Sequence, residues 1–127
     1  SLGEALLAPT RIYVKPVLDV IAKLPVKGIS HITGGGFFEN IPRVLPDGIS
    51  AKIDRSSYEV PAIFNIMQKE GNISEHDMYN TFNMGIGMML VVDKADADKA
   101  VEILKSHGEN AFVIGETVDG DDGVIFA

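Results

Sequence analysis

The sequence predicts an α+β domain in which helices back a mixed, mainly antiparallel sheet with a partly ferredoxin-like arrangement. Two patterns support this prediction. Apolar and polar residues alternate through 49–54, as they do in a strand with one buried face. The last third of the chain then has the order strand, helix, strand, strand, which is half of a ferredoxin-like unit. These four elements are expected at 86–92, 97–108, 111–118 and 123–126.

The first half combines a helix with a strand. Apolar residues recur at helical spacing after a proline that suits a first helical turn, so we expect a helix over 16–24, which Pro25 ends. Residues 26–33 are expected to form a strand that runs into three consecutive glycines. Two prolines interrupt the next segment, so 37–45 is expected to be a loop with helical turns.

Two further helices are predicted in the middle of the chain. Pro61 opens a helix whose apolar residues share one side, and Gly71 closes it. Ser74 can cap a short helix that extends through Asn80, with acidic residues in its first turn. The sequence has no internal repeat and no linker-like change in composition, so residues 1–127 are expected to form a single domain.

Composition limits the possible functions. A chain of 127 residues that is 46% hydrophobic can bury one core. It has no cysteine, which excludes disulfides and thiolate metal sites, and its three histidines have no metal-pair spacing, so no metal site is expected. There is no signal-peptide pattern and no apolar run long enough to span a bilayer, so we expect a cytoplasmic protein. The net charge of −7 argues against a nucleic-acid partner.

The most informative segment is His31–Arg43, where three glycines follow an apolar run. Ordering three glycines costs conformational entropy, so we expect a backbone that another molecule approaches closely. We interpret the segment as a strand that ends in a loop of N–H groups turned toward a phosphate or similar anion. A tight structural turn is the alternative. The predicted binding residues are Thr33, Gly34, Gly35, Gly36, Asn40 and Arg43.

Three more side chains are candidates, each with a structural alternative. The Arg11 guanidinium suits a phosphate or carboxylate, or it forms a structural ion pair. His31 enters the glycine loop, where it can donate to a phosphate or move a proton, or it is a core or strand-edge residue. The Asn83 amide can recognise a polar edge of a ligand, although a β-bulge explains the glycines after it equally well. Asn40 can instead cap a turn, with Arg43 facing water.

Four blocks of the sequence, in matching order, resemble one enzyme family. They are Pro9–Lys15, His31–Arg43, Met78–Met88 and Gly108–Ala111. The family that these blocks resemble is aminoimidazole ribonucleotide synthetase, also called phosphoribosylformylglycinamidine cyclo-ligase. The resemblance implies that the chain is part of the carboxy-terminal domain of a longer two-domain enzyme, with an amino-terminal domain ahead of it. It also implies that the isolated chain is inactive.

The resemblance implies an ATP-dependent ligase of de novo purine biosynthesis. Such an enzyme uses ATP to activate the formyl amide oxygen of formylglycinamidine ribonucleotide, after which the amidine nitrogen attacks and the aminoimidazole ring closes. The implied cofactors are ATP and Mg²⁺, bound mainly by the amino-terminal domain, and the implied assembly is a homodimer. In this scheme His31 is the catalytic candidate, and Arg11, Asn83 and the glycine-loop residues bind substrate or phosphate.

A function from another class fits the same residues. A non-catalytic regulatory domain that binds a small anionic metabolite would also use an open glycine loop, because the fold does not fix the function. A structural interaction domain is a third possibility, and it would gain no thermal stability from any nucleotide or ribonucleotide.

Overall fold

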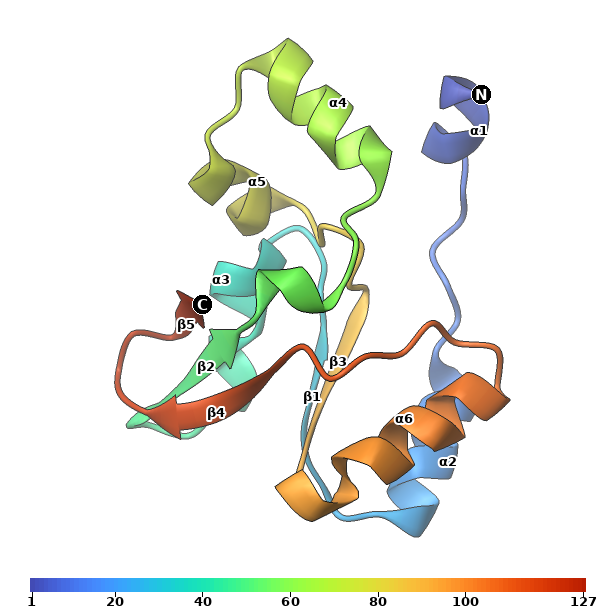
Figure 1. Cartoon of the computed structure of the whole chain (residues 1–127), viewed down its shortest axis with the longest axis vertical. Coiled ribbons are helices and arrows are strands. Elements are labelled where there is room, and N and C mark those ends of the chain that lie inside the picture. Colours follow the sequence, from blue (N-terminus) through green and yellow to red (C-terminus); the bar gives the residue numbers. More distant parts are fainter.

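The computed structural model describes residues 1–127 and shows two small sheets with helices around them (Figure 1). In the first sheet β1 (Val26–His31) pairs antiparallel with β3 (Met88–Val92). In the second, β2 (Ile49–Ile53) lies between β4 (Gly115–Asp119), which is antiparallel to it, and β5 (Val124–Phe126), which is parallel. The predicted α+β class with mainly antiparallel pairing is confirmed, and the strands are divided between two sheets.

The predicted strand over 111–118 is shorter in the structure, where β4 begins at Gly115. Its first half has no neighbouring strand to pair with, so it stays extended without a ladder. The strand β4 then pairs with β2, where a Cβ at Gly115 would lie 2.1 Å from the carbonyl oxygen of Lys52. The element order of the last third is therefore as predicted, with β3 in the first sheet and β4 and β5 in the second.

Helices α2 (Val14–Lys23) and α6 (Ala97–Ser106) pack against each other beside the first sheet. Their shared core contains Val20, which is fully buried, together with Ala100 and Ile103. The helix α2 begins before Pro16, so this proline lies in the first turn, where its missing N–H leaves no hydrogen bond unformed. Each helix presents one apolar side to the other, as the helical spacing of its apolar residues indicates.

The main core lies where α3 (Gly36–Asn40) and α5 (Glu75–Thr81) meet the strands. The predicted loop with helical turns over 37–45 contains α3 and a 3₁₀ turn at Pro42–Val44, as expected from its prolines. Large buried side chains of this core come from the two helices, from the residue that follows α3 and from β2. They are Phe37, Ile41, Ile53, Met78 and Tyr79.

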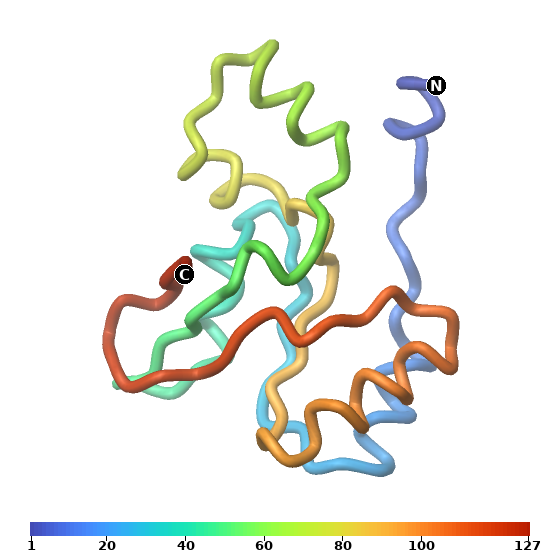
Figure 2. Tube along the Cα trace, in the orientation of Figure 1, coloured from blue at the N-terminus to red at the C-terminus, as the bar shows by residue number.

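The two remaining helices lie outside this core. The helix α4 (Ala62–Gly71) begins after Pro61 and ends at Asn72, which has a left-handed φ of 48°. The helix α1 (Leu2–Leu6) is exposed throughout and lies at the end of an extended segment that leads to α2 (Figure 2). None of the helices has the length and apolar character that a membrane crossing requires.

Candidate functional site

The triglycine loop connects β1 to α3 and contains one tight turn. Gly36 donates its N–H to the carbonyl of Thr33 over 2.9 Å. Gly36 has a φ of 56°, and a Cβ at this position would lie 2.0 Å from the carbonyl oxygen of Tyr79 in α5. The third glycine is therefore required both by its backbone conformation and by the close packing of α3 on α5. This is the structural turn that the sequence left open as the alternative.

The first two glycines leave part of the loop open. No heavy atom lies within 4 Å of the position that a Cβ would take at Gly34. The N–H groups of Gly34 and Gly35 donate no hydrogen bond within the chain, and Thr33 is exposed. Gly35 is more confined, since a Cβ there would lie 2.7 Å from the Cβ of Glu39. The loop thus has two unpaired backbone donors beside an exposed hydroxyl, which together can hold an anion.

Asn40 lies under the loop and supports it. The residue is 7% exposed, and its Nδ2 donates to the carbonyl oxygen of Gly36 over 2.8 Å. Its own carbonyl accepts a hydrogen bond of 2.9 Å from the hydroxyl of Ser30 in β1. The amide of Asn40 therefore holds the turn in the structure, in agreement with the capping alternative.

Arg43 lies on the solvent side of α3 and pairs with the carboxylate nearest the loop. Its Nη2 is 3.2 Å from Oε2 of Glu39, and both side chains are more than half exposed. The guanidinium therefore offsets the negative charge of Glu39, which would otherwise repel an anion at the loop. An ion pair this exposed is weak and exchanges readily with water, so Arg43 stays available to a bound anion.

A tyrosine that the sequence analysis did not select joins several of the candidate segments. Tyr13 precedes α2, and its ring meets the ring of His31 edge to face, with 5.9 Å between the centroids and 73° between the planes. Its hydroxyl lies so close to Gly87 that a Cβ there would be 2.1 Å away. Burial raises the pKa of Tyr13, and the nearby carboxylate of Glu109 raises it further, while Arg11 opposes this. His31 itself is exposed at the end of β1.

Arg11 forms the ion pair that was kept as its structural alternative. Its Nη1 is 2.6 Å from Oε2 of Glu109, whose side chain is only 18% exposed. Residues of all four blocks therefore meet at one place, around Tyr13: the block of Arg11, the block of His31, the block of Gly87 and the block of Glu109. The signal that could have identified Tyr13, Gly87 and Glu109 was their membership in these blocks.

Asn83 shapes the turn between α5 and β3. Its Oδ1 accepts a hydrogen bond of 3.0 Å from the N–H of Gly85, and Met84 between them has a φ of 50°. The structure shows no hydrogen bond between Asn83 and the triglycine loop. A ligand-binding role for Asn83 stays a prediction.

No group of three or more histidine, aspartate or glutamate side chains in the structure is placed to hold a metal ion. The carboxylates nearest the candidate site, Glu39 and Glu109, each pair with an arginine.

Comparison with known proteins assigns the family. The family model described as "AIR synthase related protein, C-terminal domain" matches residues 1–127, the whole chain. The chain belongs to this family. The resemblance drawn from the four sequence blocks is thereby confirmed.

Curated relatives of this family member are named phosphoribosylformylglycinamidine cyclo-ligase. Those from Caldicellulosiruptor bescii and Lachnospira eligens are each 58% identical over 125 residues, and the one from Alkaliphilus oremlandii is 54% identical. Each match covers 98% of this chain and 37% of the relative. The chain therefore spans a little more than a third of the length of these relatives.

Solved structures confirm the fold of the family member at lower sequence identity. The crystal structure of a HypE–HypF complex matches 98% of this chain and 42% of that chain, with a TM-score of 0.72 and 24% identity. The crystal structure of E. coli HypE, a hydrogenase maturation protein, matches 90% of this chain and 35% of that chain, with a TM-score of 0.69 and 24% identity. At this identity the likeness concerns the fold alone.

Proposed function

We propose that this chain is the carboxy-terminal domain of an ATP-dependent phosphoribosylformylglycinamidine cyclo-ligase and that its triglycine loop binds an anionic group of substrate or nucleotide. The main support is that residues of the four family-like blocks, far apart in sequence, meet around Tyr13. The names of relatives that are 54–58% identical agree with this function. In the full-length enzyme the reaction would convert formylglycinamidine ribonucleotide to aminoimidazole ribonucleotide in purine biosynthesis.

The loop supplies neutral donors to the anion. The N–H groups of Gly34 and Gly35 and the hydroxyl of Thr33 are exposed to a ligand and have no strong partner in the chain. Hydrogen bonds from such fixed dipoles to a phosphate are stronger than those between neutral groups. Because Gly34 has no side chain, a phosphate oxygen can come within hydrogen-bond distance of the backbone. Arg43 adds a nearby positive charge.

His31 is proposed to act on a proton at the reacting end of the substrate. His31 is the last residue of β1 and precedes the glycine loop in the chain, so we place the reacting end of a substrate whose phosphate lies on Gly34 beside its imidazole ring. The edge-to-face contact with Tyr13 restrains the orientation of this ring. Its imidazole ring can accept a proton from the attacking amidine nitrogen or donate one to the departing phosphate.

ATP and Mg²⁺ are proposed to be bound mainly by the amino-terminal domain of the full-length enzyme, as the family resemblance implies. Bound Mg²⁺ would neutralise charge on the transferring phosphoryl group. The contribution of this chain is the binding and orientation of the ribonucleotide. A homodimer and a cytoplasmic location stay predictions for the full-length enzyme.

The regulatory alternative has less support. A sensor domain would explain the open Gly34 equally well, but the relatives that are 58% identical over the 125 matched residues are named as ligases. The two functions differ in whether turnover depends on this chain.

The direct test is turnover by a full-length enzyme that carries this sequence as its carboxy-terminal domain. We expect ATP-dependent formation of aminoimidazole ribonucleotide, and no turnover by residues 1–127 alone. His31→Asn in the full-length enzyme should lower kcat by about a hundredfold with a small change in KM, as expected for a residue that moves a proton. Turnover by the isolated chain, or undiminished kcat in the variant, would overturn the proposed role.

A further inference from the structure

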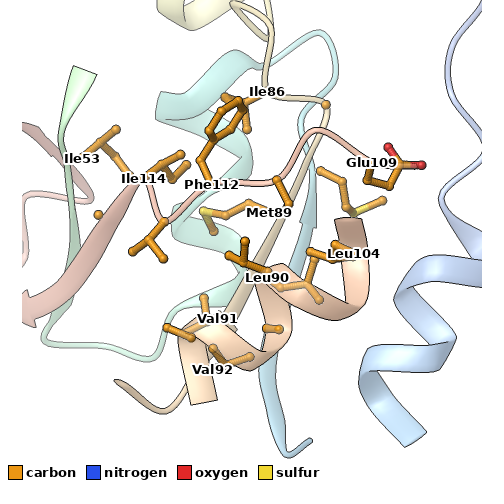
Figure 3. A pocket seen from close by; sticks show the side chains of 18 of the residues that line it. Ile53, Ile86, Met89, Leu90, Val91, Val92, Leu104, Glu109, Phe112 and Ile114 are labelled. Carbon is orange, nitrogen blue, oxygen red and sulfur yellow. The ribbon is translucent and has the colours of Figure 1, made fainter. Parts of the chain in front are cut away.

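The two sheets of this domain are separated by a hollow with apolar walls. Its volume is about 440 Å³, and it lies between β3 on one side and residues 109–117 on the other. Figure 3 shows side chains of β3 and α6, including Met89 and Leu104, beside Phe112 from residues 109–117. Of its three charged lining residues, Arg11 and Glu109 are paired with each other and Glu116 is exposed, while most of the lining is hydrophobic. The interior of the hollow is therefore suited to apolar groups.

The order of the lining residues shows that the hollow runs along a strand. On the β3 side it is lined by the eight consecutive residues 85–92, and on the other side by the nine consecutive residues 109–117. The face of a strand presents every second residue, because successive side chains point to opposite faces. Only the edge of an extended segment presents every residue in turn. The hollow is thus a groove between two backbone edges.

Both edges have unpaired backbone groups. The strand β3 pairs with β1 alone, so its second edge has no partner strand. On the opposite wall, residues 110–113 form no hydrogen bond through their backbone, and the first bond follows at the carbonyl of Ile114, which accepts from Asp54. Paired backbone is the rule in a domain interior, and an open edge recruits another strand.

We propose that this groove binds one extended apolar segment of polypeptide as an additional β-strand, which pairs with β3 and residues 110–113 and joins the two sheets into one. The strand would satisfy the free backbone groups on both walls, and its apolar side chains would fill the hollow. The predicted strand over 111–118 would then be complete. The inference depends on the family assignment and not on the anion-binding role of the loop.

The occupant is proposed to come from the rest of a full-length cyclo-ligase. The matched region is 37% of the C. bescii relative, so most of that polypeptide lies outside it and includes enough chain to supply a strand. A groove lined by residues such as Ile86, Leu90 and Ile114 requires apolar side chains from its occupant. A strand from the same polypeptide binds at high effective concentration, which suits an edge that would otherwise aggregate.

Amide hydrogen exchange followed by NMR tests this directly. The probe is the polypeptide that precedes the matched region in the C. bescii relative, mixed with the isotopically labelled 127-residue chain. We expect every second amide in 88–92 and in 110–114 to be newly protected by about tenfold or more. Absence of binding, binding without new amide protection, or protection that arises from self-association of the chain would each overturn the proposal.

Proline substitutions provide an independent test with matched controls. Neighbouring N–H groups of a strand point to opposite sides, so Phe112→Pro and Val113→Pro should differ: one should weaken binding of the probe about tenfold and the other much less. Neither substitution removes a hydrogen bond of the free chain. Phe112→Leu and Val113→Ile keep the N–H and should bind like the parent. Equal effects of the two prolines in well-folded chains would show side-chain packing without strand pairing.

Discussion

Arg11 and Glu109 form an ion pair of 2.6 Å although they are 98 residues apart in the sequence. The pair connects the segment before α2 to the turn after α6, on the side of the molecule where those two helices pack together. It also places both charges beside Tyr13. The ion pair therefore helps to fix the ring that restrains His31.

A double-mutant cycle on Arg11→Gln and Glu109→Gln measures this connection. Because Glu109 is largely buried and Arg11 is largely exposed, we expect a coupling energy of about 1 kcal/mol, at the upper end for exposed pairs. Urea unfolding of the four proteins gives the four free energies. A coupling energy indistinguishable from zero would mean that the pair does not connect the two segments.

The glycines of the loop should respond differently to the same substitution. Gly36→Ala would place a Cβ 2.0 Å from the Tyr79 carbonyl at a φ of 56°, and should cost about 3 kcal/mol or more in the free energy of unfolding. At Gly34 an added Cβ would have no heavy atom within 4 Å, so Gly34→Ala should change the free energy of unfolding by less than about 0.5 kcal/mol. Thermal and urea unfolding compare them. Similar losses at both positions would contradict the assignment of Gly36 to packing and Gly34 to an open surface.

The contacts of Asp19 should make stability depend on pH. Hydrogen bonds from Lys23 and from His107 lower the pKa of Asp19 below its ordinary 3.8. Since the folded pKa is the lower one, these contacts stabilise the fold above the unfolded pKa, and the contribution is lost as the pH falls through the folded pKa. Asp19→Asn should therefore be less stable than the parent between about pH 5 and 6, and this difference should shrink below about pH 4.

Glu59→Gln is the matched control for Asp19→Asn, because Glu59 is exposed and has no hydrogen-bonding or ion-pair partner in the structure. It should show no comparable change over the same range, measured by urea midpoints at each pH. If the stability difference between Asp19→Asn and the parent grew as the pH fell, the pKa of Asp19 would not be lowered in the folded state.

Removing the hydroxyl of Tyr58 should not lower the stability of the fold. Tyr58 is 9% exposed, and burial together with the nearby Tyr79 raises the pKa of its hydroxyl. The hydroxyl nevertheless has no partner at good hydrogen-bond geometry. A buried polar group without a partner costs free energy, so Tyr58→Phe should leave the stability unchanged or raise it by up to about 1 kcal/mol. The urea midpoint measures the effect. A clear loss of stability would show that the hydroxyl has a partner, such as an ordered water.

Much of the fold follows from local pattern. The helix after Pro61, the helix capped by Ser74 and the alternating strand at 49–53 are where propensity and periodicity place them. The separation into two sheets could not be predicted, because strand pairing is decided by contacts between residues far apart in the sequence. Residues 111–114 show this: their pattern is that of a strand, but no partner strand lies beside them.

The candidate site was predicted in part. Sequence marked the glycine loop as special, but the three glycines are identical in the sequence and differ only in their surroundings: Gly34 is open, Gly35 faces Glu39, and Gly36 contacts Tyr79. Tyr13 was missed because its contacts are with residues far apart from it in the sequence. The contact between Tyr13 and His31 joins segments that neither periodicity nor spacing connects.

We propose that the open part of the loop at Gly34 binds an anionic group of the ligand. The most direct measurement is calorimetric binding of formylglycinamidine ribonucleotide and of ATP to a full-length cyclo-ligase carrying Gly34→Val. We predict that the Kd for one of these ligands rises about tenfold or more, equivalent to about 1.4 kcal/mol, while the thermal midpoint is unchanged. Unchanged affinity for both ligands in a normally folded variant would show that the loop at Gly34 does not bind them.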